Sequence, residues 1–199
     1  RYGSSMGYDS ANSRVVLFGG CSAHPCVALD SILHFDGTSW SEPTGITTPD
    51  ARLLAQMAFH PTGNEGIIVG GTDDNDPRRP LLDTHRWTGS SWTAVPGENP
   101  FIPRQGFAFA ADRTNNNFLL FGGVVMPPPP STPEDQYMTN EMYRWEGSEW
   151  RSVATSAPQP EGRRGVAMAY DSDRGVIVLF GGVDIDDSHF GDTWEWDGT

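Results

Sequence analysis

Val15-Val16-Leu17-Phe18-Gly19-Gly20 is an apolar run that ends in a glycine pair, and three further stretches, 67–71, 118–123 and 176–182, repeat its pattern. The first glycines of the four pairs stand at positions 19, 70, 122 and 181, so successive copies lie 51, 52 and 59 residues apart. A recurrence of about 50 residues is typical of repeat architectures, in which each copy is one supersecondary unit.

Other residues recur with the same period and divide each copy into four short segments. An arginine opens each repeat, polar turn residues precede the apolar run, and an aromatic residue followed by a tight turn comes later. The opening arginines are Arg1, Arg52, Arg104 and Arg163. The later aromatics are Phe35, Trp87, Trp145 and Trp196, and in three repeats a tryptophan follows five residues on: Trp40, Trp92 and Trp150. This pattern predicts four antiparallel strands joined as a meander.

A sheet of this kind is apolar on both faces and needs cover on both sides. Stacking the copies face to face around an axis provides that cover, which predicts an all-β fold, a β-propeller of four-stranded antiparallel blades. We expect one domain over residues 1–199, with blades of about 1–51, 52–103, 104–162 and 163–199 and with the last blade lacking its outer strand. Three alternatives follow: a four-bladed propeller with an incomplete last blade, a fragment of a larger propeller, or a propeller completed by another chain. No helix is expected.

These features resemble the kelch repeats. The resemblance lies in the glycine pair after an apolar strand, in the aromatic that follows, and in the spaced tryptophan. Two segments of this chain are similar in sequence to the bacterial form of the repeat: Val-Leu-Phe-Gly-Gly at 178–182 and Asp-Thr-Trp-Glu-Trp-Asp-Gly at 192–198. The resemblance covers essentially the whole chain and implies the propeller fold. It implies little about function, because propellers serve in binding, scaffolding and catalysis.

Charge narrows the possible partners. Lys and Arg number 13 against 26 Asp and Glu, a formal net charge of −13, so a nucleic-acid partner and an anionic membrane surface are disfavoured. No apolar run has the length of a membrane-spanning helix, and we expect no membrane insertion. Cationic partners, metal ions and neutral sugars remain open.

Cys21 and Cys26 are the only cysteines, and they lie in a turn-rich loop. A disulfide between them would fit an oxidising compartment and therefore an extracellular or cell-surface protein whose targeting segment is not within these residues. Two reduced thiols are the alternative. Zinc is disfavoured, because the loop offers only His24 as a third ligand where structural sites use four.

Function is expected on one face of the propeller, where the variable connections between second and third strands emerge on a rigid scaffold. The recurring arginines occupy the same slot in every repeat, so we expect buried guanidinium groups bonded to backbone carbonyls. Three arginines, Arg78, Arg79 and Arg164, lie outside that slot and are freer candidates for ligand contact. The binding-face candidates are Asp73, Asp74, Asp76, Arg78, Arg79, Asp184, Asp186, Asp187, His189 and Trp194.

Two acidic loops carry the sharpest chemical signal. Asp73, Asp74 and Asp76 in the second repeat have counterparts in the fourth, Asp184, Asp186 and Asp187. Clustered hard oxygen ligands suit calcium, so either set is a possible calcium site, and ordinary solvated loops or a cationic partner surface are the alternatives.

The sequence favours a non-enzymatic protein that binds a protein or glycan partner through these loops. One alternative is a structural module that contacts other copies or chains through its faces or its open edge. The other is a metal-dependent oxidase, because copper-radical oxidases with the kelch fold use a cysteine-linked tyrosine and two histidines. The five histidines, His24, His34, His60, His85 and His189, show no obvious convergence.

Overall fold

The computed structural model describes residues 1–22, 25–61, 63–73, 80–97, 99–127, 130–155 and 158–198. In these ranges the regular structure is all β, apart from one turn of 3-10 helix, η1 (Pro133–Asp135). The expectation of an all-β chain is therefore confirmed. No helix in the described ranges has the length and apolar character needed to span a bilayer.

The chain divides into two compact units, Arg1–Glu98 and Asn99–Thr199, and each holds the strands of two predicted repeats. The division falls in the connection between the second and third repeats. The single domain over 1–199 stays a prediction.

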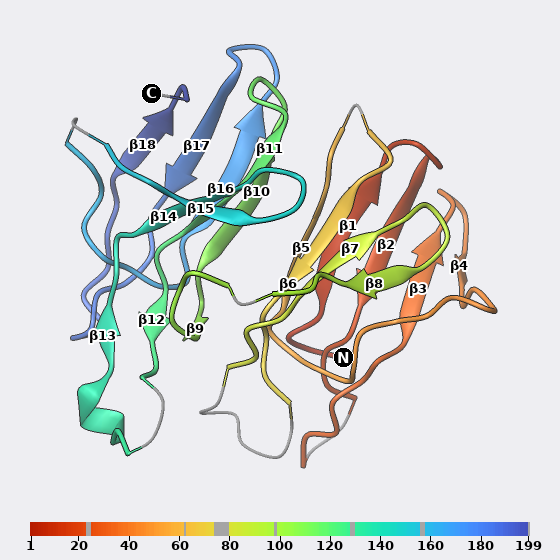
Figure 1. The fold of residues 1–199 in the computed structure, drawn as a ribbon, viewed down its shortest axis with the longest axis horizontal. Helices are drawn as coiled ribbons and strands as arrows, with labels where there is room; N and C mark the ends of the chain where they lie inside the picture. The colour runs from red at the N-terminus through yellow and green to blue at the C-terminus, as the bar shows by residue number, and fades with distance from the viewer. Residues whose placement is uncertain are drawn as a thin grey trace. The chain divides into compact units, whose positions relative to one another are not determined.

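Unit 1 contains two four-stranded antiparallel meanders, each with its strands in sequence order. Sheet 1 is formed by β1 (Ser5–Asp9), β2 (Arg14–Phe18), β3 (Ile32–Phe35) and β4 (Trp40–Ser41). Sheet 2 is formed by β5 (Gln56–Phe59), β6 (Gly66–Val69), β7 (Thr84–Trp87) and β8 (Trp92–Ala94). The two sheets stack through β1 and β5 (Figure 1).

Unit 2 repeats this arrangement and adds a small sheet. Sheet 3 is formed by β10 (Ala108–Asp112), β11 (Asn117–Phe121), β14 (Met142–Trp145) and β15 (Trp150–Val153). Sheet 4 is formed by β16 (Ala167–Asp171), β17 (Val176–Phe180) and β18 (Thr193–Trp196), and it has three strands in the described residues. The small sheet is formed by β9 (Arg104–Gln105), β12 (Val124–Val125) and β13 (Tyr137–Met138), in the order β13-β12-β9.

Stacking within a unit always joins two different faces of the repeat. We call the face of sheet 2 that carries Met57, Phe59, Trp87 and Trp92, and the equivalent face of every other sheet, the front face. The opposite face of each sheet is the back face. In sheet 1 the back face carries Val16, Phe18 and Ile32. In unit 1 the back face of sheet 1 packs on the front face of sheet 2 in one buried cluster. In unit 2 the back face of sheet 3 packs on the front face of sheet 4 in the same way.

The glycine pairs make this close stacking possible. A Cβ on Gly19 would lie 2.5 Å from the carbonyl oxygen of Arg52, the arginine of the next repeat, and the N–H of Gly20 donates to that same oxygen at 2.8 Å. In unit 2, a Cβ on Gly122 would lie 2.7 Å from the carbonyl oxygen of Arg163, and Gly123 donates to it at 2.8 Å. In these two repeats the glycine pair ends the apolar strand where the backbone of the next repeat rests on it.

Candidate functional site

The recurring arginines bind both ends, or roots, of the variable connections between the second and third strands. The side chain of Arg52 is 1 % exposed, and its Nη1 donates to the carbonyl oxygen of Gly70, where the connection of its repeat begins, at 3.1 Å. Nη1 and Nη2 also donate to the two carboxylate oxygens of Asp83, which precedes β7, at 2.5 and 2.8 Å. A bidentate guanidinium–carboxylate pair fixes geometry as well as adding energy. One arginine therefore fixes where the connection leaves the sheet and where it returns.

The same clamp recurs in the other repeats. Arg104 Nη1 donates to Gly122 O at 3.4 Å, and its Nη2 donates to Glu141 at 2.7 Å. Arg163 donates to Gly181 O at 3.0 Å and to both oxygens of Asp192 at 2.5 and 3.0 Å. In the first repeat Arg1 is exposed, and it contacts Gly19 O and the hydroxyl of Ser31, each at 3.2 Å.

The expected bonds from buried arginines to backbone carbonyls are therefore present, but sequence reasoning missed the carboxylates. The signal was available, because Asp83, Glu141 and Asp192 each stand directly before the third strand of their repeat. Ser31 takes this position in the first repeat.

The clamped connections differ in length while their roots are equivalent. They comprise residues 20–30, 71–82, 123–140 and 182–191, which are 11, 12, 18 and 10 residues long. In each unit of Figure 1 the connections leave their sheets at the lower end, opposite the short turns between first and second strands. We call these four connections the rim loops. A constant attachment with a variable loop is the arrangement of a binding scaffold.

Asp192 offers a titratable test of the clamp. The hydrogen bonds from Arg163 lower the pKa of Asp192 to about 2, with a further contribution from Trp194. Because the pKa is lower in the folded chain than in the unfolded one, the pair stabilises the fold above about pH 4, and this stabilisation is lost as the pH falls towards 2.

We expect Asp192→Asn to reduce the loss of unfolding free energy that the wild-type chain shows as the pH falls from 4 to 2. The effect should not exceed about 1 kcal/mol, because the Asp192 side chain is 39 % exposed and solvent screens the pair. Urea unfolding at several pH values measures it. Asp186→Asn, an exposed rim-loop control, should keep the wild-type profile, and an unchanged loss in Asp192→Asn would contradict the clamp.

The acidic rim loop of the fourth repeat satisfies its own backbone. The Oδ1 of Asp184 accepts the N–H groups of Asp186 and Ser188 at 2.9 and 2.8 Å. Asp187 has a positive φ of 60° and pairs with Arg164 at 2.6 Å. Within the described ranges, no three His, Cys, Asp or Glu side chains form a group that could hold a metal ion. These contacts give the Asp184 and Asp187 carboxylates structural roles in the loop.

The second acidic loop lies mostly outside the described residues. Asp73 is described and has a polar interaction, whereas Asp74, Asp76, Arg78 and Arg79 fall outside the described ranges. The candidate calcium site of this loop therefore stays a prediction.

The two remaining candidates lie in different places. His189 is exposed on the fourth rim loop, where its backbone pairs with Val183. Trp194 does not lie on the rim. It stands on the front face of sheet 4, half-buried, packs in the cluster that contains Phe121 and Met142, and donates its indole N–H to Asp192 at 2.6 Å.

Cys21 and Cys26 form a disulfide across the first rim loop, with 5.5 Å between their Cα atoms. The disulfide prediction is confirmed. Both thiols are used, so neither cysteine remains for a bond to a tyrosine.

The double change Cys21→Ser/Cys26→Ser is expected to lower the free energy of unfolding by roughly 2 kcal/mol, the loop-closure entropy of so short a loop. Thermal unfolding of this variant, compared with wild type with and without reductant, measures it. Reductant should destabilise wild type and leave the variant unchanged.

His34 on β3 is buried, and His85 on β7 is half-buried. Burial lowers the pKa of His34 and of His85, and Arg14 lowers that of His34 further. His34 Nδ1 lies 3.0 Å from Arg14 Nη1. Both imidazoles are therefore neutral at neutral pH and act as packing groups of the sheets.

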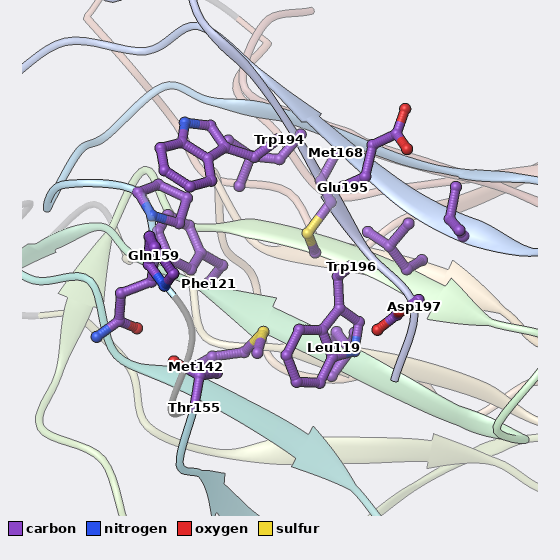
Figure 2. A pocket seen from close by; sticks show the side chains of 15 residues that line it. Leu119, Phe121, Met142, Thr155, Gln159, Met168, Trp194, Glu195, Trp196 and Asp197 are labelled. Carbon is purple, nitrogen blue, oxygen red and sulfur yellow. The ribbon is translucent and has the colours of Figure 1, made fainter. Parts of the chain in front are cut away.

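A cavity of about 440 Å³ opens between sheets 3 and 4 of unit 2. Its floor comes from the back face of sheet 3, with Leu119 and Phe121, and its opposite wall from Trp194 and Trp196 on β18 (Figure 2). The segment that leads into the fourth repeat closes one side through Pro158, Gln159 and Pro160. Sequence reasoning did not find this cavity, because its lining comes from two sheets whose side chains are far apart in the sequence.

Polar groups stand at the margin of the cavity. Gln159, Glu195 and Asp197 are exposed there. The Oγ1 of Thr155, also in the lining, is buried and has no hydrogen-bond partner among the described residues. An apolar cavity with a few polar groups has the character of a binding site, and its volume lies in the usual range of roughly 300–1,000 Å³.

Comparison with known protein families gives no matching family model, and comparison with curated proteins gives no relative.

Proposed function

We propose that this chain is a non-enzymatic binding protein of the kelch-like β-propeller type, which contacts a protein or glycan through its rim loops. The observation that carries the proposal is the arginine clamp. It holds the roots of connections of 10 to 18 residues in one geometry. Loops held in this way can differ in sequence and length without disturbing the sheets.

The propeller itself is part of the proposal. Its support is the stacking of a back face on a front face in both units. The extracellular location is supported by the Cys21–Cys26 disulfide, which suits an oxidising compartment.

Exchange of the rim loops tests the binding function. Residues 73–79, 126–136 and 184–188 are replaced, one loop at a time, by glycine–serine segments of equal length, and each clamp is left intact. Wild type and variants are applied to an array of defined glycans and to a panel of purified extracellular domains. We expect a ligand whose affinity falls at least tenfold in one or more loop variants, with thermal unfolding nearly unchanged.

The matched control places lysines at Thr38 and Ser148, both exposed in the hairpin turns at the other end of the sheets. This control should keep the affinity of wild type. Loss of binding in the control with full binding in all three loop variants would contradict the proposal, as would the absence of any ligand in both collections.

Assembly with other copies is the second candidate function, and a specific observation favours it. The front face of sheet 1 leaves Met6 60 %, Tyr8 58 % and Trp40 47 % exposed, and the back face of sheet 4 leaves Phe180 54 % exposed. Faces of these two kinds cover each other inside both units. Exposed apolar patches often mark interaction sites.

Sedimentation at several concentrations tests the assembly. We expect association that Met6→Glu or Phe180→Glu weakens, while Thr38→Lys leaves it unchanged. A strict monomer at every concentration would exclude this second function.

A further inference from the structure

Each repeat has a residue with a left-handed backbone two positions after its recurring arginine, and we call this the hub position. The four hub residues are Gly3, Leu54, Gly106 and Gly165, and their φ angles lie between 59° and 66°. Three of the four are glycine, the residue that adopts this conformation without steric strain. Leu54 is the exception, because a bulky side chain at a positive φ is an outlier.

The backbone arrangement at the hub position does not require a leucine. In unit 1 the N–H of Leu54 donates to the carbonyl oxygen of Gly3 at 2.6 Å, and in unit 2 the N–H of Gly165 donates to that of Gly106 at 2.8 Å. The same bond therefore forms with and without a side chain. A Cβ on Gly165 would have no atom within 4 Å, so the fourth repeat has room for a side chain that it does not carry.

Packing within the chain accounts for only part of the Leu54 side chain. Its Cδ2 lies 3.4 Å from where a Cβ on Gly3 would stand, so one side of the leucine rests on the preceding repeat. Leu54 is nonetheless 45 % exposed. A residue that is strained and also half in solvent lowers the stability of the fold, and such outliers cluster at functional sites.

Leu54 lies at the end of unit 1 that carries the rim loops. Its neighbour Leu53 pairs through a β-bridge with Thr72, the second residue of the rim loop 71–82. Each of the two rim loops of unit 1 adds an exposed aliphatic side chain, with Val27 51 % and Leu82 37 % exposed. Apolar groups that gather in solvent at one end of a unit are typical of an interaction site.

Carboxylates accompany these apolar residues. Asp50 is exposed and stands four residues before Leu54, so their Cα atoms lie within about 14 Å of each other. Asp30 is also exposed and follows Leu29, whose carbonyl oxygen accepts the N–H of Arg52 at 3.1 Å. The formal net charge of the chain, −13, has the same sign. A partner that covers Leu54 therefore meets acidic groups and gains from basic residues of its own.

We propose that Leu54 is an anchor for a protein partner, which covers it with an apolar side chain and flanks that side chain with lysine or arginine. The proposal rests on the rim as the binding surface proposed above, and it favours a protein over a glycan there. An aliphatic side chain forms no hydrogen bonds, so it gains only from contact with apolar surface, which protein side chains supply. The strain at Leu54 then lowers folding stability while the exposed side chain adds affinity.

Melting temperatures test the strain. Leu54→Gly is expected to melt no lower than wild type, because glycine relieves the backbone while only part of the side-chain packing is lost. Gly165→Leu, the reverse change at the hub position of the fourth repeat, should lower the melting temperature by about 3 °C or more. A clear fall in Leu54→Gly would make the leucine a structural residue, and an unchanged Gly165→Leu would remove the argument from strain.

Peptide selection tests the contact. A phage-displayed library of short random peptides is selected on the wild-type chain, and enriched peptides are synthesised with fluorescein for anisotropy titrations. We expect sequences in which lysine or arginine flanks an apolar residue. Their affinity for Leu54→Gly should be at least tenfold weaker than for wild type, and high salt should weaken wild-type binding too. Ile102→Ala, which truncates an exposed aliphatic side chain of unit 2 outside the rim loops, is the matched control and should bind as wild type does.

Absence of enriched peptides would overturn the proposal, as would equal affinity of every enriched peptide for wild type and Leu54→Gly. The rim-loop exchange variants separate this failure from a failure of the proposed function. A ligand that the loop variants lose and Leu54→Gly retains would support the rim-loop function and remove Leu54 from it. Peptides that need Leu54 but bind every loop variant as tightly as wild type would support the anchor and contradict the rim-loop function.

Discussion

Replacement of Arg52 by alanine is expected to lower the free energy of unfolding by about 3–4 kcal/mol. The guanidinium is 1 % exposed and bonds to the carbonyl oxygens of Asp50 and Gly70 and to the carboxylate of Asp83. Hydrogen bonds of a charged group contribute roughly 1.5–3 kcal/mol, and the cavity left by a large buried side chain adds to the loss. Urea unfolding monitored by circular dichroism measures the change.

Arg1→Ala is the matched control, because Arg1 occupies the same slot of the first repeat but is exposed and faces Ser31 instead of a carboxylate. We expect a loss of less than about 1 kcal/mol there. Arg52→Lys should fall between the two, since an ammonium group cannot reproduce the bidentate pair. Equal losses in Arg52→Ala and Arg1→Ala would show that the clamp does not hold the fold.

Gly122→Ala is expected to cost about 3 kcal/mol or more. Its φ of +73° strains any other residue, and the new Cβ would lie 2.7 Å from the carbonyl oxygen of Arg163. Relief of that contact moves Arg163 and loses the hydrogen bond from Gly123 to the same oxygen. Backbone strain of about 1–3 kcal/mol and the lost bond of about 0.5–1.5 kcal/mol add together.

Gly181→Ala separates the two contributions. Gly181 holds the same place in the fourth repeat with a φ of +71°, but the nearest atom to its Cβ is Phe190 O at 3.5 Å. We expect only the backbone strain, roughly 1–2 kcal/mol. Urea unfolding of both variants gives the comparison, and a similar loss in both would mean that the stacking of sheet 4 on sheet 3 does not depend on the glycine.

Sequence alone predicted the strands well because their signals are local. The aromatics expected before the tight turns stand at the ends of the third strands: Phe35, Trp87, Trp145 and Trp196 end β3, β7, β14 and β18. The bonds from the buried arginines to backbone carbonyls were also predictable, because recurrence in one slot indicates a shared structural task. The disulfide followed from two cysteines in one short loop.

The site was less predictable, because it depends on contacts between distant residues. The carboxylates of the clamp lie 29 to 37 residues from their arginines, and the variable loops between them hide the register. Trp194 has no equivalent aromatic at its position in sheets 1 and 2, so its place in the cavity could not be inferred from the other repeats. The cavity itself lies between two packed sheets, and no local residue pattern marks it.

In each clamp one arginine joins a glycine carbonyl to the acidic residue directly before the third strand. Genes that encode such repeats can therefore exchange loops by recombination. Crossing-over between copies at these two points would exchange one loop for another while both ends keep the same partners, Gly70 and Asp83 in one copy and Gly181 and Asp192 in another. Recombination inside the gene could therefore generate new rim loops in a single event, without compensating changes in the strands.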